Sequence, residues 1–148
     1  MNKDLSVFSK GIQHYFEKLT SELIIVEQPL LIQEINPHIS DYTGVIGISG
    51  SHKGSVFFSS TRGLLLELLL ALQIDGIEED IIMDLVGEVS NTVSGNARRQ
   101  LGAKFTVSPP VILKGKGEDM KVSQIEEIYL IALNWKGHKA NLIVSLEE

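Results

Sequence analysis

The 148-residue chain has no cysteine, and it has only four histidines. Without thiols there can be no disulfide, no thiol nucleophile and no thiolate metal site. No two histidines are spaced four residues apart, so the sequence shows no paired metal ligands on one helix face, and we expect no metal site. The histidines are His14, His38, His52 and His138. The net charge of -6, without a basic tract, argues against a nucleic-acid partner.

Long hydrophobic runs are also absent. The longest one, in residues 64–72, is interrupted by Glu67 and is about half the length of a membrane-spanning helix. Residues 1–9 have neither the basic start nor the continuous apolar core of a secretory signal. We therefore expect a cytoplasmic protein with no membrane partner. The mean hydropathy of +0.13 is high, which indicates a large core or an apolar surface covered by a partner.

Three helices are predicted from the spacing of apolar residues. Spacings of three and four predict a helix over residues 5–19. A second helix is predicted to end at Leu72, with Ser60 or Thr61 as its N-cap. A third and longer helix is predicted over residues 77–101. Its end is placed at residue 101 because Gly102 follows, at a position where glycine favours the end of a helix.

Shorter apolar segments bounded by turn residues predict six or seven strands. The first is a stretch over residues 23–35. Pro29 lies in its middle and indicates either an edge position or a bend between two short strands, and a loop follows the stretch. Two hairpins, a pair of short strands and a flexible turn are predicted after this loop. The loop is residues 36–41, the hairpins are 43–49 with 55–59 and 127–134 with 140–146, the short strands are 105–107 and 111–113, and the turn is 114–119.

Tight turns join most of these segments, and tight turns imply antiparallel neighbours. No internal repeat, low-complexity linker or shift in composition marks a domain boundary. The sequence therefore predicts one α+β domain over residues 1–148, with an antiparallel β-sheet packed against long α-helices.

The long helix has two different faces. Its apolar residues gather on one side of a helical wheel, which we predict to face the core. These residues are Ile82, Leu85, Val86, Val89, Val93, Ala97 and Leu101. The opposite side carries a continuous stripe spaced by four, three, four and three residues, here called the outer stripe. It consists of Asp84, Glu88, Asn91, Gly95 and Arg98.

The outer stripe is poor in residues that favour a helix. It contains Asn91 and Gly95, and Gly87 and Thr92 lie at its borders. Relative to good helix formers, these residues lower the stability of the helix by about 2 to 3 kcal/mol in total. Charges near the two ends of the helix suit its dipole, but Glu88 lies in the middle and is not explained in that way.

Three interpretations of the outer stripe are open. Exposed positions are weakly constrained, so its composition can reflect drift. A loop of the same chain can pack over it, with the glycines making room. Alternatively, another protein docks there, because the glycines let its backbone approach and Glu88 and Asn91 project together.

The segment from Gly87 to Ala97, GEVSNTVSGNA, resembles the signature helix of the CheC/CheX/FliY phosphatases of bacterial chemotaxis. The family pattern is E-x-x-N, followed in the CheX branch by G-N-A. Residues 42–50 resemble the central CheX hairpin, and residues 108–115 resemble the segment after the signature helix. The chain has one E-x-x-N pair where CheC has two, so it is most similar to the CheX branch.

The resemblance implies a CheC-like layered fold and a phosphatase acting on the aspartyl phosphate of a CheY-like response regulator. Asn91 would position the attacking water, and Glu88 would pair with the lysine beside that phosphate. The residues that contact the regulator would be Asp84, Gly87, Gly95 and Arg98. No cofactor of the enzyme itself is implied, Mg²⁺ is expected on the regulator, and the family implies a homodimer.

Two other functions are compatible with the sequence. The first is a non-catalytic binding module of the same fold, which docks a response regulator or a flagellar switch component. The second is a ligand-sensing domain with a pocket between helices and sheet, for which the sequence shows no polar cluster. Exposure of Glu88 and Asn91 side by side is the structural condition for docking.

Overall fold

The computed structural model describes residues 2–102, 105–115 and 126–147, and it contains three α-helices and one short 3-10 helix in those ranges. Each α-helix begins and ends within three residues of its predicted bounds. The 3-10 helix occupies part of the predicted loop, where Pro37 is its second residue. The helices are α1 (Asn2–Thr20), α2 (Arg62–Ala71), α3 (Glu79–Leu101) and η1 (Asn36–His38).

Eight strands form one sheet in the described part of the chain, and every pairing is antiparallel. The order is β1-β7-β8-β4-β3-β5, with β2 also paired to β7 and β6 also paired to β3. The predicted α+β class with an antiparallel sheet is confirmed. The strands are β1 (Ile25–Val26), β2 (Leu30–Ile32), β3 (Tyr42–Gly50), β4 (Gly54–Ser60), β5 (Phe105–Val107), β6 (Val111–Lys114), β7 (Glu126–Trp135) and β8 (His138–Glu147).

Prolines divide both edges of the sheet, as the sequence indicates. Pro29 lies between β1 and β2, which pair with successive parts of β7. Pro109 and Pro110 lie between β5 and β6, which pair with successive parts of β3. Proline cannot donate to a strand ladder, so each edge is built from two short strands. Of the flexible turn predicted for residues 114–119, residues 116–119 lie outside the described residues.

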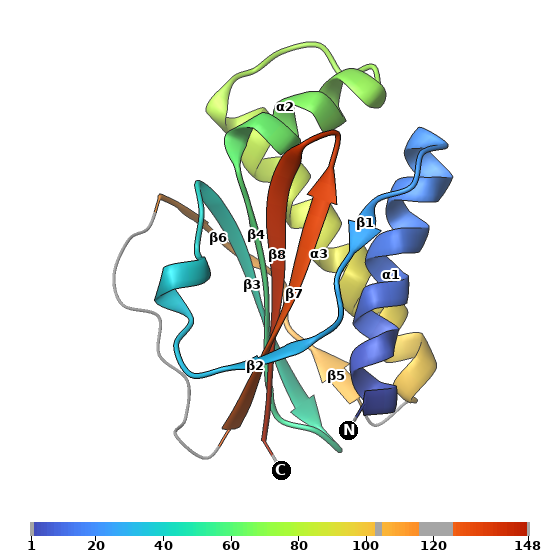
Figure 1. Cartoon of the computed structure of the whole chain (residues 1–148), viewed down its shortest axis with the longest axis vertical. Coiled ribbons are helices and arrows are strands. Elements are labelled where there is room, and N and C mark those ends of the chain that lie inside the picture. Colours follow the sequence, from blue (N-terminus) through green and yellow to red (C-terminus); the bar gives the residue numbers. More distant parts are fainter. Residues whose placement is uncertain (1, 103–104, 116–125, 148) are drawn as a thin grey trace.

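The helices cover one face of the sheet. Figure 1 shows α1 and α3 side by side and antiparallel against that face, with α2 at one end. The main core fills this space, and Phe16 of α1 meets Trp135 of β7 there with ring centroids 5.2 Å apart. A smaller core on the opposite face is covered by the segment that contains Ile35 and Ile39. Successive residues of β8 point to opposite faces of the sheet, so Leu142 lies in the main core and Ile143 in the smaller one.

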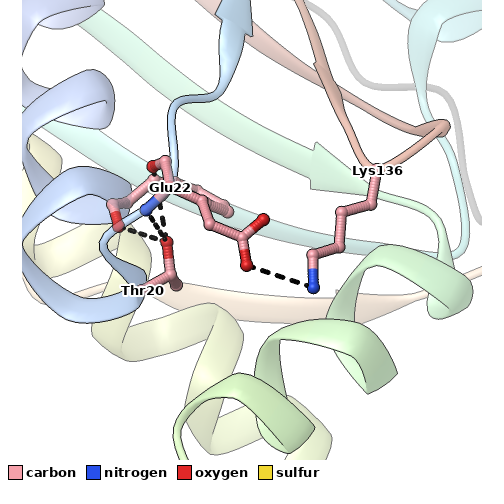
Figure 2. A network of polar contacts seen from close by, with 4 residues as sticks. Thr20, Glu22 and Lys136 are labelled. Atoms are coloured by element: carbon pink, nitrogen blue, oxygen red, sulfur yellow. Dashed lines mark hydrogen bonds and ion pairs between the residues drawn. The ribbon is translucent and has the colours of Figure 1, made fainter.

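Short polar contacts fix the ends of the helices. The Thr61 Oγ1 accepts a hydrogen bond from the Leu64 amide at 3.3 Å, so Thr61 is the N-cap of α2. At the end of α1, the Glu22 carboxylate lies 3.3 Å from the Lys136 ammonium in the β7–β8 turn, and the Thr20 hydroxyl accepts a hydrogen bond from the Glu22 amide at 3.1 Å (Figure 2).

None of the described helices is both long enough and apolar enough to cross a membrane.

Glycine allows α3 to approach the sheet closely at one point. A Cβ atom at Gly44 of β3 would lie 2.2 Å from the Ser90 Oγ of α3. That distance is far inside any van der Waals contact, so only glycine fits between helix and strand there. The approach fixes the middle of α3 against β3, and therefore fixes the direction in which the opposite face of the helix points.

Candidate functional site

The predicted core face of α3 is buried. Six of its seven residues are at most 3% exposed, and the seventh, Leu101, is partly buried against the same core. The buried residues are Ile82, Leu85, Val86, Val89, Val93 and Ala97. The outer stripe therefore has to lie on the side of α3 that faces away from the sheet.

The outer stripe is open to solvent along most of its length. Glu88 and Asn91 are both exposed, and they are three residues apart in a continuous helix, so their side chains emerge as neighbours. Asp84 and Arg98 are exposed at the two ends, and Gly95 is partly exposed. No segment of the chain in the described ranges covers the Glu88–Asn91 pair, so the condition for docking is met.

The Glu88 carboxylate and the Asn91 amide have no polar partner in the described part of the chain. Within residues 2–102, 105–115 and 126–147, neither side chain makes a hydrogen bond or an ion pair. Their backbone carbonyls accept additional hydrogen bonds from the hydroxyl groups of Thr92 at 2.9 Å and Ser94 at 3.2 Å. A carboxylate and an amide that are exposed, adjacent and unpaired are available to an external partner.

The two glycines of this face have different surroundings. Gly87 is buried, and a Cβ atom there would lie 3.6 Å from Ile112 and 3.9 Å from Pro110, in ordinary contact with the β5–β6 segment. A Cβ atom at Gly95 would meet nothing within 4 Å. Internal packing therefore borders Gly87, as the covering-loop interpretation expects, but it gives no reason for glycine at position 95.

Arg98 has a structural contact as well as an exposed position. Its Nε donates a hydrogen bond to the Phe105 carbonyl at 3.2 Å, which joins the last turn of α3 to the start of β5. The Asp84 side chain, at the other end of the outer stripe, is exposed. The two end residues therefore differ, because Arg98 alone of the two makes a side-chain hydrogen bond to another described residue.

Tyr15 of α1 is a residue that the sequence analysis did not single out. It is 3% exposed, and its buried hydroxyl has no hydrogen-bond partner among the described residues. Burial, and secondarily the negative charge of Glu88, raise the pKa of the Tyr15 phenol well above its ordinary value. The signal in the sequence was an aromatic residue beside the apolar face of α1, three residues after Ile12.

Other binding features lie away from the outer stripe. No cluster of three metal-ligating side chains occurs among the described residues. A cavity of about 420 Å³ lies between α1 and the segment joining β1 to β2, and its polar lining includes Ser9, Lys10, Gln13 and Glu27. This cavity supplies the polar cluster that the sequence did not show, but none of the outer-stripe residues lines it.

Comparison with known proteins gives a family match for this chain. A family model described as "Chemotaxis phosphatase CheX" matches residues 42–134, which is 93 of the 148 residues and includes α3. A search of curated proteins finds no match.

Solved structures of low sequence identity share the whole fold. A CheC-like superfamily protein from Shewanella sp. PV-4 is 24% identical with a TM-score of 0.86, and both chains are covered completely. The chemotaxis protein CheX from Vibrio vulnificus is 24% identical with a TM-score of 0.84 over 98% of this chain and 99% of that one. A chain of the CheX-CheY-BeF3-Mg²⁺ complex from Borrelia burgdorferi is 20% identical with a TM-score of 0.76, and both chains are again covered completely. With the family model matching more than half of its length, this chain belongs to the CheX family of chemotaxis phosphatases.

Proposed function

We propose that this chain accelerates hydrolysis of the aspartyl phosphate of a CheY-like response regulator, which docks on the outer stripe of α3. The observation that carries the proposal is the Glu88–Asn91 pair, which is exposed and has no polar partner in the described ranges, on a helix whose other face is buried in the core. The CheX–CheY complex from Borrelia burgdorferi supports the class of partner, because it pairs a protein of this fold with CheY.

In this mechanism Asn91 positions a water molecule. A side-chain amide has both donor and acceptor atoms, so Asn91 can hold the water in line with the phosphorus atom. The water oxygen forms a new bond to phosphorus while the bond between phosphorus and the aspartyl oxygen breaks. The products are the free aspartate carboxylate and inorganic phosphate, which retains the protons of the water. Orientation of this kind can contribute several orders of magnitude in rate.

Glu88 fixes the register of the two proteins. Its carboxylate pairs with the lysine beside the regulator's phosphate, and the helical spacing then places Asn91 over the same site. The presence of Mg²⁺ in the Borrelia burgdorferi complex supports a metal bound by the regulator beside its own phosphate. The chain described here then needs to supply only a carboxylate and an amide on a rigid helix.

The remaining contact surface is smaller than the sequence suggested. Asp84, Gly95 and Arg98 are open on the outer stripe, and we propose that they touch the regulator. We leave Gly87 out of this surface, because it is buried beside Pro110 and Ile112. We further propose that the chain acts in the cytoplasm and as a homodimer.

The test is phosphate release from a phosphorylated CheY-type regulator in the presence of Mg²⁺. Asn91→Ala is expected to lower kcat by about 100-fold with little change in KM, because it removes positioning and leaves docking intact. Glu88→Ala is expected to act mainly on KM. Gln100→Ala is the matched control, since it removes an exposed amide from the same helix outside the outer stripe. Normal turnover by Asn91→Ala would contradict the mechanism.

The non-catalytic binding module remains the second candidate, because the same exposed pair can bind a regulator without hydrolysing its phosphate. Wild-type protein that binds the BeF3-activated regulator, yet never accelerates phosphate release, would establish this alternative. Titration calorimetry and the release assay on one preparation separate the two functions. We expect both binding and accelerated release.

A further inference from the structure

The Tyr15 hydroxyl is a buried hydrogen-bond donor that has no acceptor within the described part of the chain. Tyr15 is 3% exposed and its ring packs edge-on against Phe16, with centroids 5.7 Å apart. Nearly all buried polar groups in folded proteins are paired, and an unpaired one destabilises the fold relative to an apolar group of the same shape. Phenylalanine would fill the same space, so the hydroxyl needs an explanation other than packing.

The arrangement of the helices places Tyr15 at the side of the outer stripe. Figure 1 shows that α1 and α3 are antiparallel neighbours. A Cβ atom at Gly11 of α1 would lie 3.2 Å from the Asn96 Nδ2 and 3.6 Å from the Val93 carbonyl of α3. Tyr15 lies one turn further along the same face of α1, and it therefore faces an earlier turn of α3. Glu88 lies within that part of α3.

Electrostatics independently connects the phenol with Glu88. The Glu88 carboxylate acts on the pKa of Tyr15, and it raises that pKa in the same direction as burial. The phenol therefore keeps its proton and remains a donor at any physiological pH. Glu88 is an exposed acceptor without a partner in the described ranges, so an unused donor and an unused acceptor lie near each other.

We propose that Tyr15 is a positioning residue, whose hydroxyl donates a hydrogen bond to the Glu88 carboxylate when a response regulator docks on the outer stripe. The bond selects one rotamer of a long and flexible side chain, and this rotamer points the second carboxylate oxygen at the regulator's lysine. The inference rests on the function proposed above and adds to it a residue from α1. An exposed glutamate alone would lose rotamer freedom on docking, and the phenol lowers that entropic penalty.

Two other polar aromatic residues of the core do not have this combination of features. The Tyr42 hydroxyl is satisfied, because it donates to Glu79 at 2.8 Å. The Trp135 Nε1 is a second buried donor that has no partner among the described residues, but the Lys136 ammonium, 5.1 Å from the ring centroid, cannot accept a hydrogen bond. Among the described residues, only the Tyr15 hydroxyl combines an orphaned donor with an unpaired carboxylate of the candidate site.

The experiment compares Tyr15→Phe in the wild-type and in the Glu88→Ala background, using phosphate release from a phosphorylated CheY-type regulator. In the wild-type background, Tyr15→Phe is expected to lower kcat/KM by about tenfold through KM, which is the effect of one hydrogen bond to a charged group. In the Glu88→Ala background it is expected to change kcat/KM by less than about twofold, because the acceptor is gone.

Tyr42→Phe is the matched control, because it also removes one hydroxyl from a tyrosine that is 3% exposed. It breaks the bond to Glu79, which lies in the first turn of α3 and outside the outer stripe. The two variants should therefore show opposite patterns. Tyr42→Phe lowers Tm and leaves kcat/KM unchanged, whereas Tyr15→Phe leaves Tm unchanged or higher and lowers kcat/KM. A change in folding alone cannot produce the second pattern.

Two results would overturn the role of Tyr15. One is a wild-type kcat/KM for Tyr15→Phe, and the other is an equal loss with and without Glu88. Asn91→Ala tells these failures apart from failure of the proposed function. If Asn91→Ala is inactive and Tyr15→Phe is normal, only the role of Tyr15 is wrong. If Asn91→Ala is fully active, the proposed function is wrong.

Discussion

At the scale of single residues, the outer stripe is defined by what surrounds each side chain. Glu88 lies in the middle of α3, more than two turns from Glu79 at its start, where the helix dipole gives a carboxylate no stabilisation. Gly95 has open space in the direction of a side chain. Packing among the described residues explains neither of them, which is what a face that contacts a partner would show. Gly95 is therefore as informative about docking as the charged residues are.

Gly95→Ala is expected to stabilise the protein and to weaken its activity. The added methyl group meets nothing within 4 Å in the free chain, so α3 gains about 1 kcal/mol from helix propensity, or about 3 °C in Tm. The same methyl group would stand between α3 and a docked backbone, and we expect kcat/KM to fall by about tenfold. Thermal melts and phosphate release measure the two effects separately.

Gly87→Ala is the matched control for that variant. It makes the same substitution in the same helix, but the new methyl group is in ordinary contact with Ile112 and Pro110 and is hidden from a partner. We expect unchanged kcat/KM. If Gly87→Ala and Gly95→Ala weaken activity equally, the loss reflects α3 in general and the docking role of Gly95 is wrong.

The sequence was sufficient to predict which side of α3 faces outward, because helical periodicity is a local property. The exposure of Glu88 and Asn91 follows from the burial of residues such as Val86, Val89 and Val93. The burial of Gly87 depends on β6, which lies more than twenty residues later, and no local pattern encodes that contact. Tyr15 escaped notice for a similar reason, since Glu88, whose charge acts on its pKa, is far away in the sequence.

At the scale of secondary-structure elements, the position of α3 depends on its contact with β3. Gly44→Ala would force a Cβ atom to within 2.2 Å of the Ser90 Oγ. Ser90 is buried, and its hydroxyl donates to the Val86 carbonyl at 2.8 Å, so it cannot turn away without breaking that bond. We expect a loss of about 2 to 3 kcal/mol in the free energy of unfolding, measured by urea denaturation.

Gly47→Ala provides the comparison for Gly44→Ala in the same strand. A Cβ atom at Gly47 would approach only the Ser108 side chain, at 3.4 Å, and α3 is not involved. A loss of stability well below that of Gly44→Ala is expected. Equal losses would show that the cost comes from replacing glycine in β3 and not from the approach of α3.

The start of α3 is tied to two strands by a cluster of charges. Glu79 accepts hydrogen bonds from the Tyr42 hydroxyl at 2.8 Å and from the Lys114 ammonium at 2.7 Å. Both bonds lower the pKa of Glu79 below its ordinary value of 4.5, and the bond from Lys114 has the larger effect. The hydrogen bond to Glu79, followed by the negative charge of Glu79, raises the pKa of Lys114 above its ordinary value of 10.5.

The cluster should make stability depend on pH in a defined direction. A carboxylate with a lowered pKa in the folded state contributes stability above its ordinary pKa, and this contribution is lost as the pH falls through the lowered value. The contribution of Lys114 to stability depends on pH in the opposite direction, because it is lost as the pH rises through the raised pKa of Lys114. The Tm difference between wild type and Glu79→Gln should therefore be greatest between these limits and vanish in acid. It should be small, because both groups are largely exposed.

A series of thermal melts from neutral to acid pH checks this expectation, with Glu78→Gln as the control. Glu78 is the neighbouring carboxylate, and its removal leaves the bonds of Glu79 in place. A Tm difference for Glu79→Gln that persists undiminished in acid would show that its cause is the shape of the side chain and not its charge.

Long elements were predictable from the sequence, but short ones were only partly so. The two hairpins and the three α-helices have many residues in a regular pattern, and their bounds were close to those observed. β1 has two residues and β2 has three, and both exist because β7 offers them a partner. The single turn of η1 likewise lies within a segment predicted as a loop. Such segments are defined by tertiary pairing and not by their own composition.

At the scale of the whole molecule, the fold supports α3 from inside, and the described part of the chain leaves the outer stripe exposed. The sheet and α1 hold the helix, while a net charge of -6 gives no broad positive surface to attract an acidic partner. Recognition then has to depend on the local outer stripe. A second copy of the chain in a homodimer must therefore bind elsewhere on the molecule, if both copies are to act on a regulator.

The stoichiometry of the complex tests this arrangement. Light scattering coupled to gel filtration should give a mass of about twice the 16.3 kDa of one chain, since the family resemblance implies a homodimer. Adding BeF3-activated regulator should then give two regulators per dimer, because each outer stripe remains open. A dimer that binds one regulator or none would show that dimerisation covers α3 and would contradict the docking surface. A monomer that binds one regulator would contradict the homodimer alone and leave the proposed chemistry intact.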